Sequence, residues 1–227
     1  LGGPIFSVNA GQLIGHPEFF EDFCHSVVTF EGEEPMHRLL SALKAGDSLY
    51  TVPNLLHEDG GNVVQNKERV ELRFEDLPNP VFDGLPMDKY LSPYPIIPVL
   101  QSRGCYWGKC TFCTHSFVYG HRYGKQKTQA MVDELENLMK KYNTKYFTFS
   151  DEAVSPNAFD RMSKAVMKLN VDMRALAMIK FESNSVESAK LFEDMFKAGF
   201  IMLFFGLESA NNRNLELIDK GTEKDNE

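Results

Sequence analysis

The sequence has few cysteines, no long apolar run and no excess of basic residues. Its 227 residues include 4 Cys, too few for a secreted scaffold of this size held by disulfides. No apolar stretch approaches the roughly 18 residues that a membrane-spanning helix needs. The net charge of −8 does not support the concentrated basic face that a nucleic-acid surface requires. These absences exclude a membrane-spanning protein and a disulfide scaffold, and they argue against binding to nucleic acid.

Apolar and aromatic residues are plentiful. Hydrophobic residues make up 43% of the chain and aromatic residues 12%, with glycine and proline scattered rather than repeated. This composition predicts a soluble globular protein with enough chain for one large domain or two small ones. No signal peptide opens the sequence, so we expect the reducing cytoplasm to be its compartment. The turn Gly2-Gly3-Pro4 directly after Leu1 indicates a chain cut at its front.

Charge is distributed unevenly along the chain, which predicts two modules. Residues 1–95 hold 15 acidic and 6 basic residues, whereas residues 96–227 hold 17 acidic and 18 basic residues. Prolines concentrate over residues 77–97, where hydrophobic periodicity is weak. We therefore predict a first domain over 1–76, a proline-rich linker over 77–97 and a second domain over 98–227.

The first domain is expected to be small and of mixed α/β type. Val27–Phe30 is a short β-branched and aromatic run that predicts a strand. Glu33-Glu34-Pro35 is followed by a predicted helical segment to about Ala45, with Pro35 at an early helix position and Gly46 as its stop. Leu49–Pro53 and Val63–Gln65 predict the two strands of a β-hairpin, because turn-forming residues lie between them.

The second domain alternates short apolar runs with amphipathic segments. Each run is followed by residues whose apolar positions recur at helical spacing. The predicted strands are Val99-Leu100, Tyr146–Phe149, Arg174–Ile179 and Ile201–Phe205. This order requires a parallel sheet covered by helices, and right-handed crossovers allow a doubly wound sheet or an α/β barrel. With four strand-helix units, such a (β/α) barrel would be partial.

Three of the four cysteines lie within nine residues, directly after the first predicted strand of the second domain. Cys105, Cys110 and Cys113 share a glycine-containing loop. Chemistry in parallel α/β folds takes place at the carboxyl ends of strands. Three thiolates can hold three irons of a cubane cluster and leave the fourth iron open to a small ligand. The spacing therefore favours a four-iron four-sulfur cluster with one open position.

Two other interpretations of this loop remain open. His115 follows Cys113 closely, so the three cysteines and His115 have the residue types of a closed structural zinc site. Cys110 and Cys113 alone form a CxxC pair of the thiol-disulfide type, which leaves Cys105 without a role. Cys24 is the remaining cysteine, and its neighbours predict a buried core thiol rather than a fourth ligand.

The second domain resembles the radical SAM superfamily. The family's hallmark is CxxxCxxC after the first barrel strand with an aromatic residue before the last cysteine, a position that Phe112 takes here. Four residues separate Cys105 from Cys110 instead of three, a spacing similar to that of members in which GCYW or GCWW opens the loop. FTFSDE at 147–152 and the GLES segment from Gly206 resemble family segments that end later strands.

The resemblance implies roles for individual residues. Phe112 would contact the adenine side of S-adenosylmethionine. The candidate contacts to its methionine or ribose portion are Asp151, Glu152 and Glu208. Acids at such positions are also common in the first turn of a helix, where they interact with its dipole. Arg174 and Lys180 would meet a carboxylate, and a solvated charge is the alternative for both.

The first domain resembles the closing part of the cobalamin-binding domains found ahead of radical SAM domains. Gly2 and Gly3, followed by the Val27–Phe30 run, are similar to the part that lies beside the nucleotide tail of the cofactor. The DxHxxG segment, whose histidine ligates cobalt in that family, is absent from this sequence. The resemblance therefore implies at most half of a cobalamin site, and an ordinary loop is the alternative for Gly2-Gly3.

These likenesses predict a radical S-adenosylmethionine enzyme, present here as a fragment that alone can be inactive. They imply cleavage of S-adenosylmethionine to methionine and a 5′-deoxyadenosyl radical, with an electron donor such as flavodoxin or ferredoxin. Candidate reactions are cobalamin-dependent methyl transfer and modification of a peptide or a small metabolite. The alternative from a different class is a zinc-stabilised α/β binding module without redox chemistry.

The predicted fourth strand has a consequence for assembly. The family's core usually has six strand-helix units, so a chain that stops after the fourth leaves the apolar strand Ile201–Phe205 at a sheet edge. Such an edge presents unpaired backbone groups. We expect the isolated chain to self-associate, or the native protein to continue.

Overall fold

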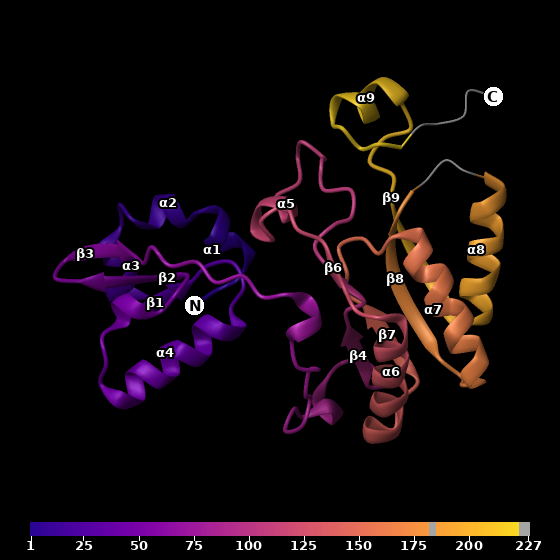
Figure 1. The fold of residues 1–227 in the computed structure, drawn as a ribbon, viewed down its shortest axis with the longest axis horizontal. Coiled ribbons are helices and arrows are strands. Elements are labelled where there is room, and N and C mark those ends of the chain that lie inside the picture. Colours follow the sequence, from indigo (N-terminus) through magenta and orange to yellow (C-terminus); the bar gives the residue numbers. More distant parts are fainter. Residues whose placement is uncertain (182–184, 223–227) are drawn as a thin grey trace. The chain divides into compact units, whose positions relative to one another are not determined.

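The computed structural model describes residues 1–181 and 185–222, and its chain divides into two compact units (Figure 1). The N-terminal unit consists of residues 1–73 together with residues 114–121. The C-terminal unit consists of the remaining residues, from 74 to 113 and from 122 onward. A linear division at residues 76 and 97 does not anticipate that the segment after Cys113 returns to the first unit.

The N-terminal unit contains an antiparallel sheet of order β1-β2-β3, with β1 over Ser26–Val28, β2 over Leu55–Asp59 and β3 over Asn62–Gln65. A hairpin is therefore present, as predicted, but its first strand begins at Leu55. Leu49–Thr51 forms a short 3₁₀ helix instead of a strand. The physical reason is the turn, because Gly60 and Gly61 both take positive φ, at 60° and 82°, and such a two-residue turn pairs the strands that flank it directly.

Helices cover this small sheet. The prediction for α4 is confirmed, since the helix runs over Glu33–Ala45 and ends at Gly46 with φ 72°. Buried side chains of the sheet pack against it and against a second apolar group around Phe20. The other helices of the unit are α1 (Pro4–Val8), α2 (Ala10–Leu13), α3 (Pro17–Asp22) and α5 (His115–Val118). In α5, Phe117 lies 5.8 Å from Phe30, ring centre to ring centre, which joins this later segment to the unit.

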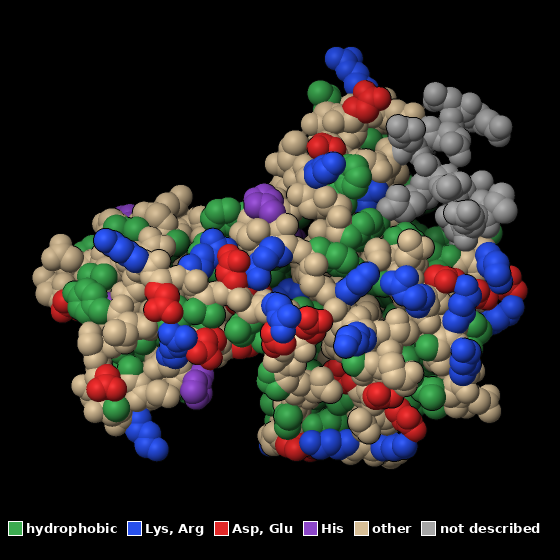
Figure 2. Space-filling model, viewed as in Figure 1, with side chains coloured by type: hydrophobic (Ala, Val, Ile, Leu, Met, Phe, Trp, Pro, Cys, Tyr) green, Lys and Arg blue, Asp and Glu red, His purple; other side chains and the backbone are tan. Residues whose placement is uncertain are grey.

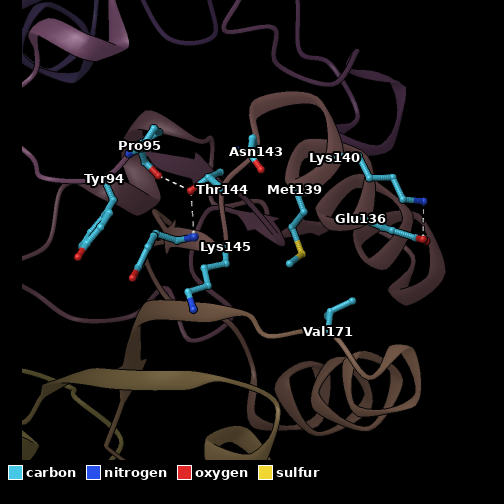
Figure 3. A pocket seen from close by; sticks show the side chains of 10 residues that line it. Tyr94, Pro95, Glu136, Met139, Lys140, Asn143, Thr144, Lys145 and Val171 are labelled. Atoms are coloured by element: carbon cyan, nitrogen blue, oxygen red, sulfur yellow. Dashed lines mark hydrogen bonds and ion pairs between the residues drawn. The ribbon is translucent and has the colours of Figure 1, made fainter.

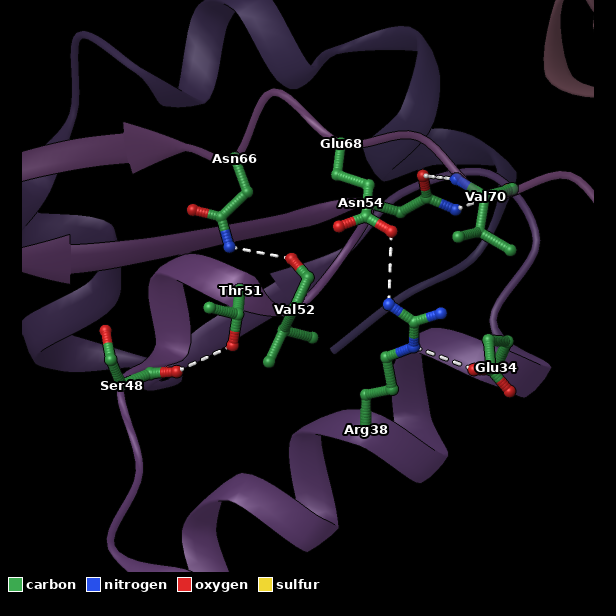
Figure 4. A network of polar contacts seen from close by, with 9 residues as sticks. All are labelled: Glu34, Arg38, Ser48, Thr51, Val52, Asn54, Asn66, Glu68 and Val70. Atoms are coloured by element: carbon green, nitrogen blue, oxygen red, sulfur yellow. Dashed lines mark hydrogen bonds and ion pairs between the residues drawn. The ribbon is translucent and has the colours of Figure 1, made fainter.

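Polar side chains fasten the loops of the N-terminal unit to its sheet (Figure 4). Asn54 takes a left-handed backbone conformation, with φ 55°, and its side-chain amide donates to the carbonyl of Val70 at 3.1 Å. Asn66 donates to the carbonyl of Val52 at 2.7 Å. Arg38 on α4 donates to Glu68, in the segment after β3, at 3.1 Å. The segment after β3 is thus held by hydrogen bonds that replace missing ladder partners.

The C-terminal unit contains the predicted parallel sheet, of order β4-β7-β8-β9 (Figure 1). Its strands are β4 (Ile96–Val99), β7 (Tyr146–Phe149), β8 (Arg174–Lys180) and β9 (Phe200–Gly206). The prediction of an α/β fold with four parallel strands is confirmed, and among the described residues the sheet does not close into a barrel. The first strand begins earlier than predicted. It accommodates Pro98 because β4 is an edge strand, where one side needs no backbone donor.

Three long helices lie on one side of this sheet (Figure 1), namely α6 (Thr128–Tyr142), α7 (Pro156–Leu169) and α8 (Ser185–Lys197). Alternate strand residues face them and are buried, including Ile97, Phe147 and Ala175. Phe159 on α7 is fully buried between Phe149 and Phe200, at ring-centre distances of 6.3 and 5.4 Å. A short helix α9 (Asn212–Leu217) follows β9. The helices thus secure one face and leave the carboxyl ends of the strands free to carry the site.

Charges of both signs lie among one another on the visible face of the C-terminal unit (Figure 2). Several belong to pairs four residues apart on a helix, such as Lys140 with Glu136 and Lys164 with Asp160, both at 2.7 Å. Such pairs stabilise a helix by a few tenths of a kcal/mol each, about 0.3 to 0.5. Within the part of the chain that the structure describes, we find no helix of sufficient length and apolarity to span a membrane.

Candidate active site

The cysteine loop, residues 104–113, begins just after β4 and the two-residue strand β5 (Ser102–Arg103), which pairs with β6 (Gly124–Lys125). Cys105 also forms a parallel bridge with Ala153, which follows β7. The loop therefore begins beside the carboxyl ends of two neighbouring parallel strands. Farther along, the backbone N–H of Cys113 donates to the carbonyl of Cys110 at 3.1 Å. All four cysteines of the chain are free.

Two acids after β7 hold the beginning of this loop by its backbone. The carboxylate of Asp151 accepts from the N–H of Gln101 at 3.1 Å and from the hydroxyl of Ser102 at 2.6 Å, and it also accepts from the N–H of Ser102. Glu152 accepts from the N–H of Gly104 at 3.2 Å. These carboxylates take the place of ladder partners for a stretch of chain that turns sharply. A contact of either acid with the methionine portion of a cofactor stays a prediction.

Asp151 is the most perturbed carboxyl of the site. The residue is 1% exposed, and burial raises the pKa of Asp151 to about 6, although the hydrogen bonds from Ser102 and the backbone act in the opposite direction. Its carboxylate is already occupied by three protein donors. The structure therefore shows Asp151 in a supporting position beneath the cysteine loop.

Glu208 and Phe112 lie near the same buried cation. Glu208 follows β9 with φ 65°, an uncommon left-handed conformation for a residue with a side chain. Its carboxylate accepts from Nζ of Lys220 at 3.0 Å, and Lys220 is 8% exposed. The same Nζ lies 5.9 Å from the ring centre of Phe112, whose exposed fraction is 54%. Phe112 thus leaves much of its surface open to a ligand.

Arg174 lies at the opposite edge of the sheet, which corrects its assignment to the site. It begins β8, in register with Tyr146 at the start of β7, and it pairs with Asp172 at 3.0 Å. Lys180 ends the same strand, roughly 20 Å farther along at about 3.3 Å per residue. Lys180 is 6% exposed and donates to the carbonyl of Gly221 at 2.9 Å. Of these two cations, the structure brings Lys180 to the cysteine loop.

The charges of two buried lysines affect the pKa of the Cys110 thiol. Partial burial raises the pKa of Cys110 above its usual value, while the positive charges of Lys220 and Lys180 act in the opposite direction. Bringing two buried cations close to a thiol favours negative charge at that place. Burial and the neighbouring Cys105 and Cys113 outweigh the two lysines, so the pKa of Cys110 stays above its usual value.

The described residues contain no group of three or more His, Cys, Asp or Glu side chains arranged to hold one metal ion. His115 begins α5 in the segment assigned to the N-terminal unit, and its ring stacks on Tyr119 at 6.4 Å between centres. Cys24 also belongs to that unit and packs, partly buried, against the apolar group around Phe20. A four-ligand zinc arrangement is thus not preformed in this part of the structure.

Gly2 and Gly3 lie in the N-terminal unit. Gly2 forms a parallel bridge with Val28 of β1, and a Cβ atom on Gly2 would lie 3.2 Å from the carbonyl oxygen of Val28. Gly3 precedes α1 with φ 107°, and no atom lies within 4 Å of the place where its Cβ would be. The pair therefore extends the sheet at Gly2 and leaves open space at Gly3. Its predicted place beside a nucleotide tail stays a prediction.

A pocket lies at the other edge of the parallel sheet (Figure 3). Its volume is about 570 Å³, and its lining includes Tyr94, Met139, Thr144 and Lys145. Tyr94 stacks on Tyr146, the first residue of β7, with ring centres 4.6 Å apart. The pocket is therefore at the amino ends of the strands, away from the cysteine loop, where residues of this fold class serve stability.

Comparisons with known proteins show which family this chain resembles. The model of the radical SAM superfamily matches residues 99–226. The "uncharacterized methyltransferase PH0819" of Pyrococcus horikoshii is 31% identical over 201 residues, which cover 86% of this chain and 43% of that protein. The bacteriochlorophyllide d C-12(1)-methyltransferase of Chlorobaculum tepidum is 27% identical over 133 residues, or 57% of this chain and 28% of that protein. The chain spans less than half the length of these relatives.

Two solved structures share the fold. The cobalamin-dependent S-adenosylmethionine radical enzyme OxsB superposes with a TM-score of 0.76 at 22% identity, covering 97% of this chain and 32% of that protein. The radical S-adenosylmethionine methyltransferase TsrM from Kitasatospora setae superposes with a TM-score of 0.69 at 19% identity, covering 98% and 44%. Because the family model matches more than half of its residues, this chain belongs to the radical SAM superfamily of enzymes.

Proposed function

We propose that the chain holds a four-iron four-sulfur cluster on Cys105, Cys110 and Cys113, and that the full enzyme cleaves S-adenosylmethionine there. One observation carries the proposal: three free thiols share a loop that begins beside the carboxyl ends of β4 and β7. Chemistry in this fold class is placed at that edge. Free thiols also suit a reducing compartment such as the cytoplasm.

A cluster and a zinc ion place different demands on the three thiols. A zinc ion at about 2.3 Å from each sulfur requires its ligands to converge on one point. In a cubane the three thiolates bind three separate irons, so they stay farther apart. Because the two arrangements hold different metals, the metal and sulfide content distinguishes them.

The chain's own residues would orient the cofactor and shape its surroundings. When bound, the cluster supplies the electron that splits S-adenosylmethionine into methionine and a 5′-deoxyadenosyl radical. Phe112, with its exposed ring, would contact the adenine side. Glu208 and Lys180 would meet the amino and carboxylate groups of the methionine portion, while Asp151 would hold the loop through its hydrogen bonds to Gln101 and Ser102.

The full enzyme's reaction is proposed by likeness to its relatives. Two of them are named as methyltransferases, and OxsB is described as cobalamin-dependent. We propose methyl transfer to a small molecule or peptide, with cobalamin beside the N-terminal unit near Gly2 and Gly3. A flavodoxin or ferredoxin would supply electrons.

The test is the iron, zinc and acid-labile sulfide content of the chain after anaerobic reconstitution. We expect about four irons and four sulfides per chain, with little zinc. One tightly held zinc without sulfide would instead establish the zinc-stabilised binding module, in which the same cysteines are structural. After the reconstituted cluster has been reduced chemically by one electron, addition of S-adenosylmethionine should change its electron paramagnetic resonance spectrum, because the open iron accepts a ligand.

Self-association of the chain is a further prediction. β9 ends the sheet order, and its Met202 and Phe204 are 49% and 53% exposed. An apolar edge strand pairs readily with another chain. We expect light scattering to show a mass that rises with concentration, and Phe204→Lys to reduce that rise. Phe196→Lys, at a 70% exposed position on α8, is the control, and a monomer at high concentration would contradict the prediction.

A further inference from the structure

Residues 218–222, which follow α9, are bonded to the cysteine loop. The carbonyl of Ile218 accepts from the backbone N–H of Thr111, between Cys110 and Cys113, at 3.0 Å. The carbonyl of Asp219 accepts from Nε1 of Trp107 at 2.6 Å. Both halves of the loop are therefore tied to a segment more than 100 residues away in sequence.

The same segment is bonded to the end of β8. The carbonyl of Gly221 accepts from Nζ of Lys180 at 2.9 Å, and the hydroxyl of Thr222 donates to the carbonyl of Phe181 at 2.7 Å. Thr222 is 4% exposed. Because β8 is an inner strand of the sheet, its end is a firm base for the segment. Residues 218–222, called the strap from here on, thus connect the cysteine loop to the sheet.

Gly221 and Trp107 are in closer contact than any side chain at position 221 would allow. Gly221 has φ 62°, and a Cβ atom placed on it would lie 2.0 Å from Cζ2 of Trp107 and 2.2 Å from Cη2. Both are atoms of a rigid ring whose Nε1 is already bonded to Asp219, so the ring cannot yield without breaking that bond. Nζ of Lys180 lies 5.0 Å from the ring centre and adds a favourable cation–π contact.

We propose that the strap positions the cysteine loop for its cluster. The close contact between Gly221 of the strap and the indole ring of Trp107 in the loop holds the two segments together. The role rests on the proposed function, because it concerns the loop that would hold the iron. Trp107 acts through the backbone of the loop and is a positioning residue. Gly221 is required because its missing side chain is the space that the indole ring fills.

Gly221→Ala tests this role in two ways. Trp107 is the single tryptophan of the chain, so its fluorescence reports on the loop even without iron. We expect Gly221→Ala to raise the acrylamide quenching constant of the iron-free chain at least about twofold, because the ring is displaced into solvent. After reconstitution, we expect a chelator to remove iron from Gly221→Ala at least about tenfold faster than from the unaltered chain.

Gly84→Ala is the matched control. Gly84 lies in the same unit with φ 84°, so alanine there carries a similar backbone strain, but no atom lies within 4 Å of its Cβ position. Both readouts should stay unchanged in Gly84→Ala. Unaltered quenching and iron release in Gly221→Ala would overturn the role of the strap. A chain that loads no iron at all would refute the proposed function, while the quenching result would still decide on the strap.

A second background, Trp107→Phe, tests the contact even if Gly221→Ala alone disturbs folding. Trp107→Phe lacks the ring atoms that Cβ would meet at position 221. Adding Gly221→Ala to Trp107→Phe should therefore change the rate of iron release less than twofold. A tenfold change in that background would show that Gly221 acts through its backbone alone, which contradicts the role of its contact with Trp107.

Discussion

Replacing Cys110 by alanine is expected to abolish the bound cluster while the α/β fold survives. Cys110 is partly exposed and lies outside the apolar core, so its loss removes no buried packing. A cubane bound by only two thiolates on this loop loses one of its three anchors. We expect iron and sulfide after reconstitution to fall from about four each per chain to less than about one, with an unchanged far-ultraviolet circular dichroism spectrum.

Cys24→Ala is the control for this experiment. Cys24 is also a free, partly buried thiol, but it belongs to the N-terminal unit. We expect its alanine variant to retain full iron and sulfide. Loss of zinc together with unfolding in Cys110→Ala would contradict the cluster, since a structural zinc site contributes to folding directly. Loss of iron in both variants would contradict the assignment of the three ligands.

Asp151→Ala is expected to cause the largest loss of stability among the site variants. Alanine leaves the N–H of Gln101 and both donors of Ser102 buried without their acceptor. An unsatisfied buried donor costs about 1 to 3 kcal/mol, and relief of a buried charge offsets part of the sum. We expect the free energy of unfolding at pH 7 to fall by about 2 to 4 kcal/mol in urea titrations. Asp172→Ala, an exposed acid at the far edge, should leave it nearly unchanged.

The same carboxyl gives a pH dependence with a defined sign. Burial raises the pKa of Asp151 to about 6 in the folded chain, above its value of about 3.9 when unfolded. Between these values the folded state binds more protons, so the free energy of unfolding declines as pH rises from about 4 to about 6 and is constant above. The decline contributed by Asp151 is at most about 3 kcal/mol. Asp151→Asn should lack it, and an equal decline in that variant would contradict the assignment.

Much of the fold was predictable from the sequence because its signals are local. Tyr146–Phe149 and Glu33–Ala45 agree with the predicted strand and helix, since residue type and end signals act within a few residues. The hairpin was placed wrongly at Leu49–Pro53, because apolar residues there resemble a strand while the turn at Gly60-Gly61 fixes the pairing farther on. The geometry of this turn therefore decides that the apolar run beginning at Leu55, and not the one beginning at Leu49, forms the strand.

The cysteine loop was predictable from the sequence, but the residues that support it were less so. The spacing of the cysteines indicates a loop on which they lie together, whatever surrounds it. Whether an acid after a strand faces a ligand or the backbone depends on side-chain direction, and Asp151 faces the backbone. Arg174 and Lys180 lie at opposite ends of one strand, and only the length and register of that strand show which of them reaches the cysteine loop. The contact of Trp107 with Gly221 joins residues 114 positions apart, which no local pattern reveals.

The return of residues 114–121 to the N-terminal unit has a consequence for how this protein can be divided. The chain passes between the units three times, at 73–74, 113–114 and 121–122. A single cut near residue 73 would therefore leave both fragments joined through α5, whose Phe117 packs on Phe30. Removing residues 1–73 would instead remove Phe30, the partner of Phe117 in α5, and α5 begins only two residues after Cys113. The two units are thus inseparable by simple truncation, and a gene fusion or domain exchange has to carry both together.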